Sequence, residues 1–306
     1  MGRYVARRIL LMIPTVLAVL VFVFVVFRVV PGDVVRLIAG EYATESQIQA
    51  LRAQLGLADP IPVQFARYLA GIARGDLGKS LIYGRPVARE ILVRLPATIE
   101  LAVAGIGVSL LVGLVAGVVS AVKRNSWYDY ISRLLSVAGV CIPNFWIALV
   151  LIALFSVRLG WLPTAGRSGL TSLVLPTISL SSRLTAIIAR LTRSTMLEAM
   201  RQDYVRTARA KGLGEYATIC RHAMKNALIP VTTVVGLQFG ALLGGSIVVE
   251  TVFSWPGIGL LLVQAVSSRD YPMIQGITVV YAACFILINL VTDMVYSYLD
   301  PRVRYE

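Results

Sequence analysis

One stretch of the sequence comes close to a nucleotide-binding motif. It reads Ala73-Arg74-Gly75-Asp76-Leu77-Gly78-Lys79-Ser80 and fits the pattern G-x-x-x-x-G-K-[ST], except that alanine replaces the first glycine. Such a loop cradles phosphate groups when it follows a buried β-strand, and an aspartate after a second hydrophobic strand holds the magnesium ion. Because the sequence predicts neither strand, we interpret residues 73–80 as a plain turn.

Few residues of the chain could bind a metal or act as a nucleophile. His222 is the single histidine, which excludes a bis-histidine haem site and an H-E-x-x-H metal site. Cys141, Cys220 and Cys284 lie far apart and lack C-x-x-C spacing, so neither a zinc site nor a disulfide framework is expected. An intramembrane hydrolase would need a nucleophile beside a base, or a set of metal ligands. We therefore expect no catalytic residue, no metal site and no cofactor bound by this chain.

The composition is typical of a membrane protein. Of 306 residues, 57% are hydrophobic and 15% are charged, against about 45–50% and about 25% in soluble domains. These values exclude a water-soluble enzyme. The formal net charge of +13 comes from arginines and lysines that are spread over many short hydrophilic gaps, so it does not indicate nucleic-acid binding.

Six apolar segments are predicted to cross the membrane as helices, each of which needs about 20 residues. Five of them carry no charge and cover residues 9–27, 101–122, 134–157, 226–249 and 271–292. The sixth, residues 170–189, contains Arg183 and is followed by Arg190 and Arg193, so its polar face is expected to meet protein or water. Segment 9–27 lacks a small-residue cleavage site and is interpreted as a retained anchor. The predicted fold class is an all-α polytopic membrane protein with six transmembrane helices.

Basic residues in the short loops indicate the orientation. They gather before the first span, between the second and third, and between the fourth and fifth, and with Arg302 and Arg304 they all lie in the cytoplasm if six helices cross. The uncharged run 251–268 would be a seventh span, but its sequence Ser254-Trp255-Pro256-Gly257 breaks a helix early. We expect a short external re-entrant or interfacial hairpin over residues 251–270 and both termini in the cytoplasm.

The chain is predicted to have three parts. Residues 1–30 form the N-terminal tail and first span, residues 31–96 a small extracytoplasmic domain, and residues 97–306 a core of five membrane helices. Within the extracytoplasmic domain, residues 51–57 and 63–72 have the apolar spacing of helices.

A polar loop in the core, residues 198–228, carries a predicted short helix. Asp203 is a good N-cap and Gly212 a good stop, and the basic residues between them suit the C-terminal end of a helix. A stiff, capped helix parallel to the membrane can press into a groove of a partner protein and transmit force. The residues alone fit equally well with an interfacial helix whose arginines touch anionic lipid head groups.

Here the sequence resembles a known family. Residues 203–213, followed by His222-Ala223 and Asn226-Ala227-Leu228-Ile229-Pro230, are similar to the coupling loop of permease subunits of ABC importers for dipeptides, oligopeptides, glutathione or nickel, in particular the first, B-type permease. Further motifs shared with that family are Pro31-Gly32-Asp33, Gly75-Asp76-Leu77-Gly78, Pro143-Asn144-Phe145-Trp146, Thr192-Arg193-Ser194-Thr195-Met196-Leu197, Phe253-Ser254-Trp255-Pro256-Gly257-Ile258-Gly259, Arg269-Asp270-Tyr271-Pro272 and Asp300-Pro301-Arg302. Together they cover nearly the whole chain.

Two positions depart from the family pattern. Importers at large often end the loop with Ile-x-Leu-Pro about thirteen residues after the glycine. Here Lys225 takes the thirteenth position, and Pro230 lies eighteen residues after Gly212. The longer spacing resembles the peptide and nickel branch. The frequent Pro-Gly-Asp-Pro motif ends here with Val34 in place of the second proline, which affects only the local turn.

The resemblance implies a type I ABC importer fold and a non-catalytic subunit of a bacterial or archaeal cytoplasmic (inner) membrane. Such a subunit pairs with a second, homologous permease, docks on two cytoplasmic ATPase subunits that bind ATP and magnesium, and receives substrate from an external binding protein. The short helix would be the coupling helix, which converts closure and opening of the ATPases into alternating access. The coupling residues implied are Asp203, Tyr204, Arg206, Thr207, Ala208, Arg209, Ala210, Lys211 and Gly212.

Several small and polar residues at membrane depth are candidates for the translocation pathway. Gly236, Gly240 and Gly244 lie four residues apart on one face of the fifth span, where small residues let helices approach closely. This face either packs within the chain or forms the subunit interface at which the pathway opens. The polar candidates are Asn144, Gln238, Glu250, Asn289 and Asp293. They either touch the substrate or serve helix packing, because polar groups buried in the membrane need partners.

The expected function is therefore ATP-driven import, with this chain forming the pathway for short peptides or a related small solute. The alternative is a secondary transporter, which needs no ATPase but is expected to show inverted repeats and intramembrane acids for ion coupling. No repeat between the two halves is evident, and Asp293 is the only acid well inside a span. The chain has no cluster of histidine or cysteine to hold bare nickel.

Overall fold

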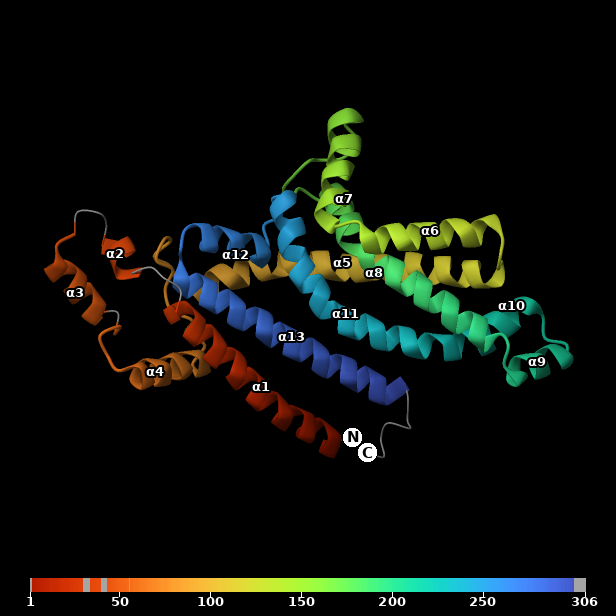
Figure 1. The fold of residues 1–306 in the computed structure, drawn as a ribbon, viewed down its shortest axis with the longest axis horizontal. Helices are drawn as coiled ribbons and strands as arrows, with labels where there is room; N and C mark the ends of the chain where they lie inside the picture. Colours follow the sequence, from red (N-terminus) through yellow and green to blue (C-terminus); the bar gives the residue numbers. More distant parts are fainter. Residues whose placement is uncertain (1, 30–33, 40–42, 55, 300–306) are drawn as a thin grey trace. The chain divides into compact units, whose positions relative to one another are not determined.

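The structure, a computed structural model, describes residues 2–29, 34–39, 43–54 and 56–299, and these residues are mostly helical (Figure 1). The helices are α1 (Gly2–Val29), α2 (Val34–Ala39), α3 (Glu45–Gln54), α4 (Ile61–Ala73), α5 (Val87–Val122), α6 (Trp127–Cys141), α7 (Asn144–Leu151), α8 (Leu170–Ala199), α9 (Asp203–Ala210), α10 (Glu215–Ala217), α11 (Met224–Val252), α12 (Ile258–Ser267) and α13 (Tyr271–Leu299), with the π-helical segments η1 (Ile152–Arg158) and η2 (Thr218–Ala223). Within the ranges given, no strand occurs beyond an isolated bridge between Lys79 and Pro86. The family motifs at 31–33 and 300–302, and the basic tail residues Arg302 and Arg304, lie outside these ranges.

Three helices are long and apolar enough to cross a membrane: α5, α8 and the part of α13 up to Thr292. A fourth span results if the bent pair of α6 with α7 and η1 counts as one. The count covers only residues whose side chains are described. Parts of α1 and α11 fall outside it, so these two helices are not tested as spans over their full length. Six crossing helices therefore stay a prediction, whereas the weaker segment 170–189 is confirmed as part of a 30-residue apolar helix.

The predicted span 134–157 is not one continuous helix. α6 ends at Cys141, α7 begins at Asn144, and the chain bends by 108° at this break. Ile142 and Pro143 between them have extended backbones, with φ/ψ of −83°/126° and −63°/142°. Proline disfavours the helical region for the residue before it and has no N–H to donate, so it ends α6. If this segment crosses the membrane, it does so as a bent pair of helices.

The chain forms two compact units. The first unit contains Ala97–Pro256 and the end of α13 from Leu287, and the second contains the N-terminal helices up to Pro96 together with Gly257–Ile286. Because α5 begins at Val87, this helix starts inside the part that the sequence predicts as extracytoplasmic.

α8 is the central helix of the first unit. It packs against α6, α7 and α11 (Figure 1), and also against α5. The contact with α5 is close at two glycines, because a Cβ on Gly113 would come within 2.8 Å of Ile188 and a Cβ on Gly117 within 2.6 Å of Thr192. Small residues are what allow two membrane helices to approach this closely. The sequence analysis had placed such a contact only on α11.

The turn at residues 73–80 belongs to the second unit. The Ser80 hydroxyl donates to the buried carboxylate of Asp270, which also accepts from the backbone N–H groups of Leu81 at 3.2 Å and Met273 at 3.3 Å. The carboxylate thereby attaches the turn to the first residues of α13. This structural use of Ser80, together with α4 in place of a preceding strand, confirms that residues 73–80 form a plain turn.

The small helices of the second unit agree in part with the predictions. α4 confirms the predicted helix 63–72, whereas α3 ends at Gln54, short of the predicted end at residue 57. Gly56, with a left-handed φ of +66°, lies in a turn that a continuing helix would not allow. α12 has 10 residues, which is too short to cross a bilayer and fits the predicted hairpin.

Candidate functional site

α9 is the short helix predicted in the polar loop. Gly212 follows its end with a φ of +80°, the left-handed conformation for which glycine is favoured after a helix, so Gly212 ends α9 as predicted. The N-cap residue is Gln202, which has an extended backbone and no side-chain cap bond. The assignment of Asp203 as N-cap was therefore wrong. Asp203 lies in the first turn, where its charge favours the positive end of the helix dipole.

α9 has one buried face and one exposed face. Val205 and Ala208 are buried. Val205 belongs to a cluster that we call the α9 anchor, made of Ala121, Met196, Ala199, Val205, Ala223 and Ala227. Of the nine residues that the family resemblance implies for coupling, Ala208 is turned inwards and the other eight are exposed. The structure thus places these eight on the outside of an element whose inner face is fixed to the end of α8.

An ion pair links α9 to α10. Arg209 Nη2 lies 2.9 Å from Glu215 Oε1, and the two side chains are 41% and 65% exposed. A pair this exposed contributes about 0–1 kcal/mol. It therefore orients Arg209 on the surface without deciding whether the loop folds.

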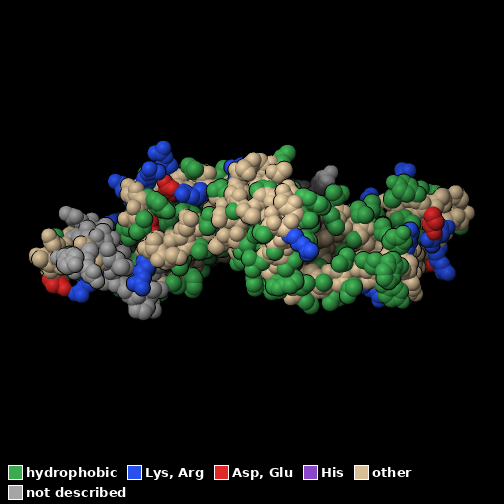
Figure 2. All heavy atoms as spheres, turned by 90° about the horizontal axis from the view of Figure 1, so that it is seen from above, with side chains coloured by type: hydrophobic (Ala, Val, Ile, Leu, Met, Phe, Trp, Pro, Cys, Tyr) green, Lys and Arg blue, Asp and Glu red, His purple; other side chains and the backbone are tan. Residues whose placement is uncertain are grey.

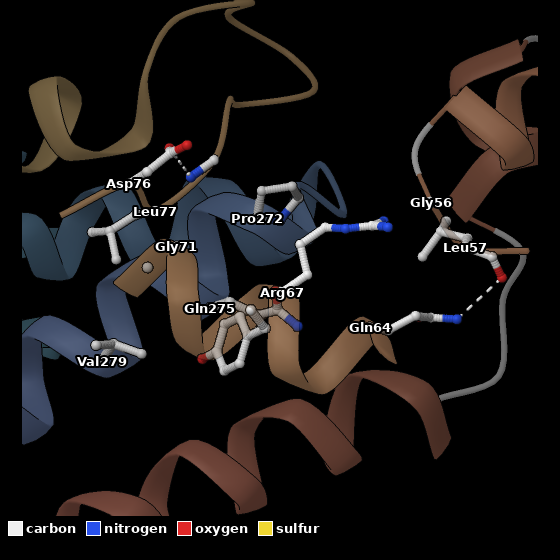
Figure 3. A pocket seen from close by; sticks show the side chains of 13 residues that line it. Gly56, Leu57, Gln64, Arg67, Gly71, Asp76, Leu77, Pro272, Gln275 and Val279 are labelled. Atoms are coloured by element: carbon white, nitrogen blue, oxygen red, sulfur yellow. Dashed lines mark hydrogen bonds between the residues drawn. The ribbon is translucent and has the colours of Figure 1, made fainter. Parts of the chain in front are cut away.

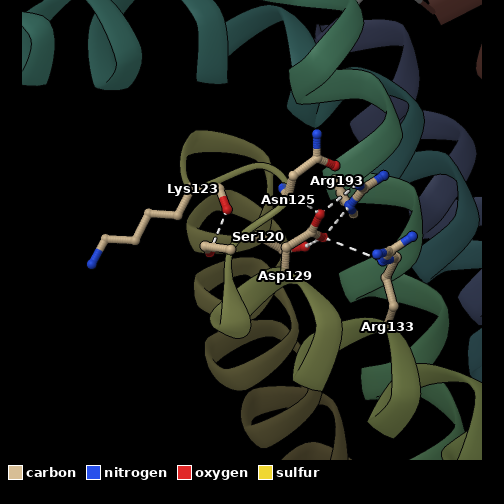
Figure 4. Close-up of polar contacts among 7 residues, drawn as sticks. Ser120, Lys123, Asn125, Asp129, Arg133 and Arg193 are labelled. Carbon is tan, nitrogen blue, oxygen red and sulfur yellow. Dashed lines mark hydrogen bonds and ion pairs between the residues drawn. The ribbon is translucent and has the colours of Figure 1, made fainter.

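A buried ion pair ties three helices together (Figure 4). Asp129, in the first turn of α6, has a side chain that is 0% exposed, and Arg193 of α8 donates to both of its oxygens at 2.7 and 2.9 Å. Ser120 Oγ from α5 donates at 2.6 Å, and the backbone N–H of Asn125 donates at 3.0 Å. The carboxylate thereby joins α5, α6 and α8 one turn before Met196 of the α9 anchor.

The sequence analysis missed Asp129, although one signal points to it. Asp129 is the only acidic residue between Glu100 and Glu198, and a lone charge beside membrane segments needs a partner. The expectation that the arginines around the segment 170–189 meet protein or water is confirmed for Arg193, which meets protein.

The glycine row of α11 has two different surroundings. A Cβ on Gly236 would lie 1.9 Å from Thr292 Cγ2, so this glycine packs tightly against α13 within the first unit. A Cβ on Gly244 would have no atom within 4 Å, and Gly244 is exposed. Gly240 lies between them and is half-buried. One end of the row therefore packs inside the chain and the other end is open.

Asn144 lies at the bend before α7 and contacts α8. Its carbonyl oxygen accepts from Ser179 Oγ at 2.8 Å, and its Oδ1 lies 3.5 Å from Ser182 Oγ. A Cβ on Gly245 of α11 would come within 3.6 Å of Asn144 Nδ2. Asn144 therefore lies at the junction of α7, α8 and α11.

The other polar pathway candidates lie on α11 and α13. Glu250 is buried near the end of α11, and its Oε1 accepts from Thr98 Oγ1 at 2.8 Å. Gln238 and Asn289 are half-buried. Asp293 lies on α13, but its side chain falls outside the described residues. In the described conformation the Glu250 carboxylate is closed off from any solute.

Arg183 and Arg190 lie on the open side of α8. Both are exposed, and a spacing of seven residues places them on one face, two turns apart. Neither forms an ion pair or hydrogen bond within the described part of the chain. A guanidinium at the bilayer centre costs about 2.5–3.5 kcal/mol on insertion scales. The open side of α8 is therefore unlike a lipid-facing surface.

Exposed apolar side chains occur on the other helices. On α5, Val103 is 59% exposed and Leu111 is 69% exposed. On the face drawn in Figure 2, hydrophobic side chains cover large areas, and lysine and arginine form separate small groups. Soluble monomers rarely expose apolar patches of this extent, so these surfaces are suited to lipid or to partner subunits.

The second unit contains a cavity of about 290 Å³ between α4, the turn at 76–78 and the first turns of α13 (Figure 3). Two of its polar side chains are already bound to neighbouring groups. Gln64 Nε2 donates to the carbonyls of Leu57 at 3.2 Å and Asp59 at 2.7 Å, and Arg67 pairs with the Asp59 carboxylate at 2.7 Å. These contacts brace the α3–α4 connection, and they leave Gln275 of α13 as a further polar group in the lining.

The sequence matches two models of one family. Residues 113–305 match the family described as binding-protein-dependent transport system inner membrane component, and residues 1–102 match its N-terminal membrane component. The glutathione transport system permease protein GsiC is 46% identical in Pectobacterium atrosepticum and 45% identical in Escherichia coli K12, over 306 residues and 100% of both chains. The dipeptide transport system permease protein DppB of Alkalihalophilus pseudofirmus is 44% identical over 330 residues, which cover 99% of each chain.

Solved structures share the fold. The inward-facing MetNI methionine ABC transporter has a TM-score of 0.58 at 18% identity, covering 69% of this chain and 96% of that chain. An amino acid ABC transporter with histidines has a TM-score of 0.52 at 16% identity, covering 70% and 94%. The fold is that of the type I ABC importer permeases. The chain belongs to the inner membrane components of binding-protein-dependent transport systems, as a non-catalytic permease subunit of an ABC importer whose ATPase activity resides in partner subunits.

Proposed function

We propose that this permease forms the translocation pathway for short peptides, a class that includes glutathione. Its relatives along the full length are named as glutathione and dipeptide transport permeases, at 44–46% identity. Dipeptides and glutathione share a free amino group, a free carboxylate and amide bonds. One pathway chemistry therefore serves both.

The complex in this proposal contains a second, homologous permease, two ATPase subunits that bind ATP and magnesium, and an external substrate-binding protein. α9 docks on an ATPase subunit. The observation that carries this assignment is the direction of its two faces, because Val205 and Ala208 point into the protein while the polar residues point out. An amphipathic helix that lies on lipid turns its apolar residues to the bilayer instead.

A contact route leads from α9 into the membrane helices. The α9 anchor joins Val205 to Met196 at the end of α8. One turn earlier, the pair of Arg193 with Asp129 joins α8 to α5 and α6. A displacement of α9 by the ATPases therefore acts on three helices through packed and hydrogen-bonded contacts, which supports its role as the coupling helix.

The topology in this proposal has six crossing helices and both termini in the cytoplasm. Residues 1–30 contribute the first span, residues 31–96 lie outside the membrane on the extracytoplasmic side, and residues 97–306 form the core with the coupling loop 198–228. The hairpin 251–270 remains external. Lys123 and Arg124 between α5 and α6, and the basic residues of the coupling loop, support this orientation.

Purification and uptake test this function. The chain, extracted from its own membrane in mild detergent, is expected to bring with it a second permease and two ATPase subunits, identified by mass spectrometry. In proteoliposomes with the external binding protein, the complex is expected to accumulate labelled dialanine or glutathione only when ATP is present. Active ATPases without uptake of either compound would overturn the substrate class, and a chain that purifies without ATPases would overturn the partners.

A further inference from the structure

The second half of α8 has one open side. The other sides are covered by α5, α6, α7 and α11 of the same chain, and fourteen of its residues are buried. Arg183 and Arg190 lie on the open side, together with Ser194. A side that faced acyl chains would resemble the exposed apolar face of α5 around Leu111. The open side of α8 is instead cationic and faces something polar.

Arg183 lies inside the apolar segment 170–189 of α8. It is the fourteenth of the 30 residues of α8, which places it about 20 Å from one end of the helix and about 24 Å from the other at 1.5 Å per residue. Charged residues at this depth face a water-filled cavity or a partner, and within the described chain Arg183 forms no ion pair.

Polar groups lie beside Arg183. The preceding residue, Ser182, contacts the Asn144 side chain at the bend before α7, and Ser179 donates to the Asn144 carbonyl. The bend thereby brings hydroxyl and amide groups to the same depth as the guanidinium. This combination of a cation with neutral polar neighbours is suited to a hydrated passage.

We propose that Arg183 lines the translocation pathway and binds a carboxylate of the solute as it passes. This inference rests on the proposed function, since short peptides and glutathione carry a carboxylate. A guanidinium stays charged and presents paired N–H donors that match both carboxylate oxygens. Because Arg183 is exposed and stands alone at its depth on α8, its hold on the carboxylate is weak enough for release, as conduction requires.

Chemical modification of a cysteine tests this inference in the reconstituted complex. Cys141, Cys220 and Cys284 are first replaced by serine, and Arg183→Cys is then treated with one of two water-soluble methanethiosulfonates. The aminoethyl reagent restores a positive charge, and the sulfonatoethyl reagent adds a negative one. Leu111→Cys on the apolar face of α5 is the matched control.

We expect both reagents to label Arg183→Cys and neither to label Leu111→Cys. Uptake of labelled dialanine is expected to fall at least tenfold in Arg183→Cys, to recover largely with the aminoethyl reagent, and to stay low with the sulfonatoethyl reagent. Arg183→Lys is expected to retain most of the uptake. The two permeases should remain associated throughout, because the charge acts on the solute and not on assembly.

Three results would overturn the inference. An unlabelled cysteine at position 183 would place this side of α8 against lipid or protein. Normal uptake in the unmodified Arg183→Cys complex would remove the role in binding, and separation of the two permeases would assign Arg183 to a subunit interface. If the cysteine-free complex with Arg183 intact takes up neither dialanine nor glutathione, the proposed function fails. Labelling of the cysteine at position 183 is independent of uptake, so it still decides whether α8 lines a water-filled passage.

Discussion

Asp129→Asn is expected to destabilise the first unit strongly. The buried carboxylate accepts two hydrogen bonds from Arg193, one from Ser120 and one from the Asn125 backbone. An amide has one acceptor oxygen and turns its NH₂ group towards other donors, so it cannot accept all four. Removal of one partner from a buried ion pair costs about 3–5 kcal/mol. Since Arg193 is 20% exposed and keeps some contact with solvent, we expect the lower end, about 3 kcal/mol.

The thermal midpoint of the purified complex measures this loss. At about 2–4 °C per kcal/mol for domains of 150–250 residues, the midpoint is expected to fall by roughly 6–12 °C. Asp59→Asn is the matched control, because its pair with Arg67 is 2.7 Å long but 61% and 39% exposed and contributes about 1 kcal/mol at most. Equal shifts for the two variants would refute the reasoning. So would strictly additive effects of Asp129→Ala and Arg193→Ala, since partners in one ion pair must show a coupling energy.

Two further predictions concern packing and topology. Gly236→Leu is expected to lower recovery of the chain because a Cβ at this position would lie 1.9 Å from Thr292, whereas Gly244→Leu, with no atom within 4 Å, should be recovered normally; equal recovery on quantitative immunoblots would contradict this. A cysteine placed at Gln64 should react with an impermeant thiol reagent added outside intact cells, whereas one at Glu215 should react only after lysis, and the reverse pattern would invert the topology.

Most helices could be predicted from the sequence, because length and hydropathy act locally. Uncharged runs of about 20 residues mark the long helices, and Gly212 marks the end of α9 because its position after a helix favours glycine. The bend between α6 and α7 was missed for a physical reason. The run 134–157 is uniformly apolar, so hydropathy does not register that Pro143 breaks the helix within it.

The contacts of the candidate site could not be predicted in the same way. Asp129 and Arg193 are 64 residues apart in sequence, and only the packing of α6 on α8 brings them together. Gly236 and Gly244 look alike in the sequence, yet Thr292 fills the space beside Gly236, whereas no neighbouring atom of the described residues would lie within 4 Å of a Cβ on Gly244. The residue pattern of α9 predicts that residues 203–210 form a helix. It does not predict that the Ala208 side chain is buried, because that depends on the position of α9 relative to the end of α8.

ATP-driven uptake with the charges of the α9–α10 pair exchanged tests the coupling role of α9 most directly. Arg209→Glu reverses a charge on the exposed face and breaks the 2.9 Å pair with Glu215, whereas the double variant Arg209→Glu with Glu215→Arg restores the pair and keeps position 209 reversed. If α9 docks on an ATPase subunit, both variants should insert and fold normally, bind less ATPase on purification, and take up labelled dialanine at least tenfold more slowly than the unaltered complex. Full recovery of uptake and ATPase binding in the double variant would show that Arg209 only holds the loop together, and it would contradict the assignment of α9 as the coupling helix.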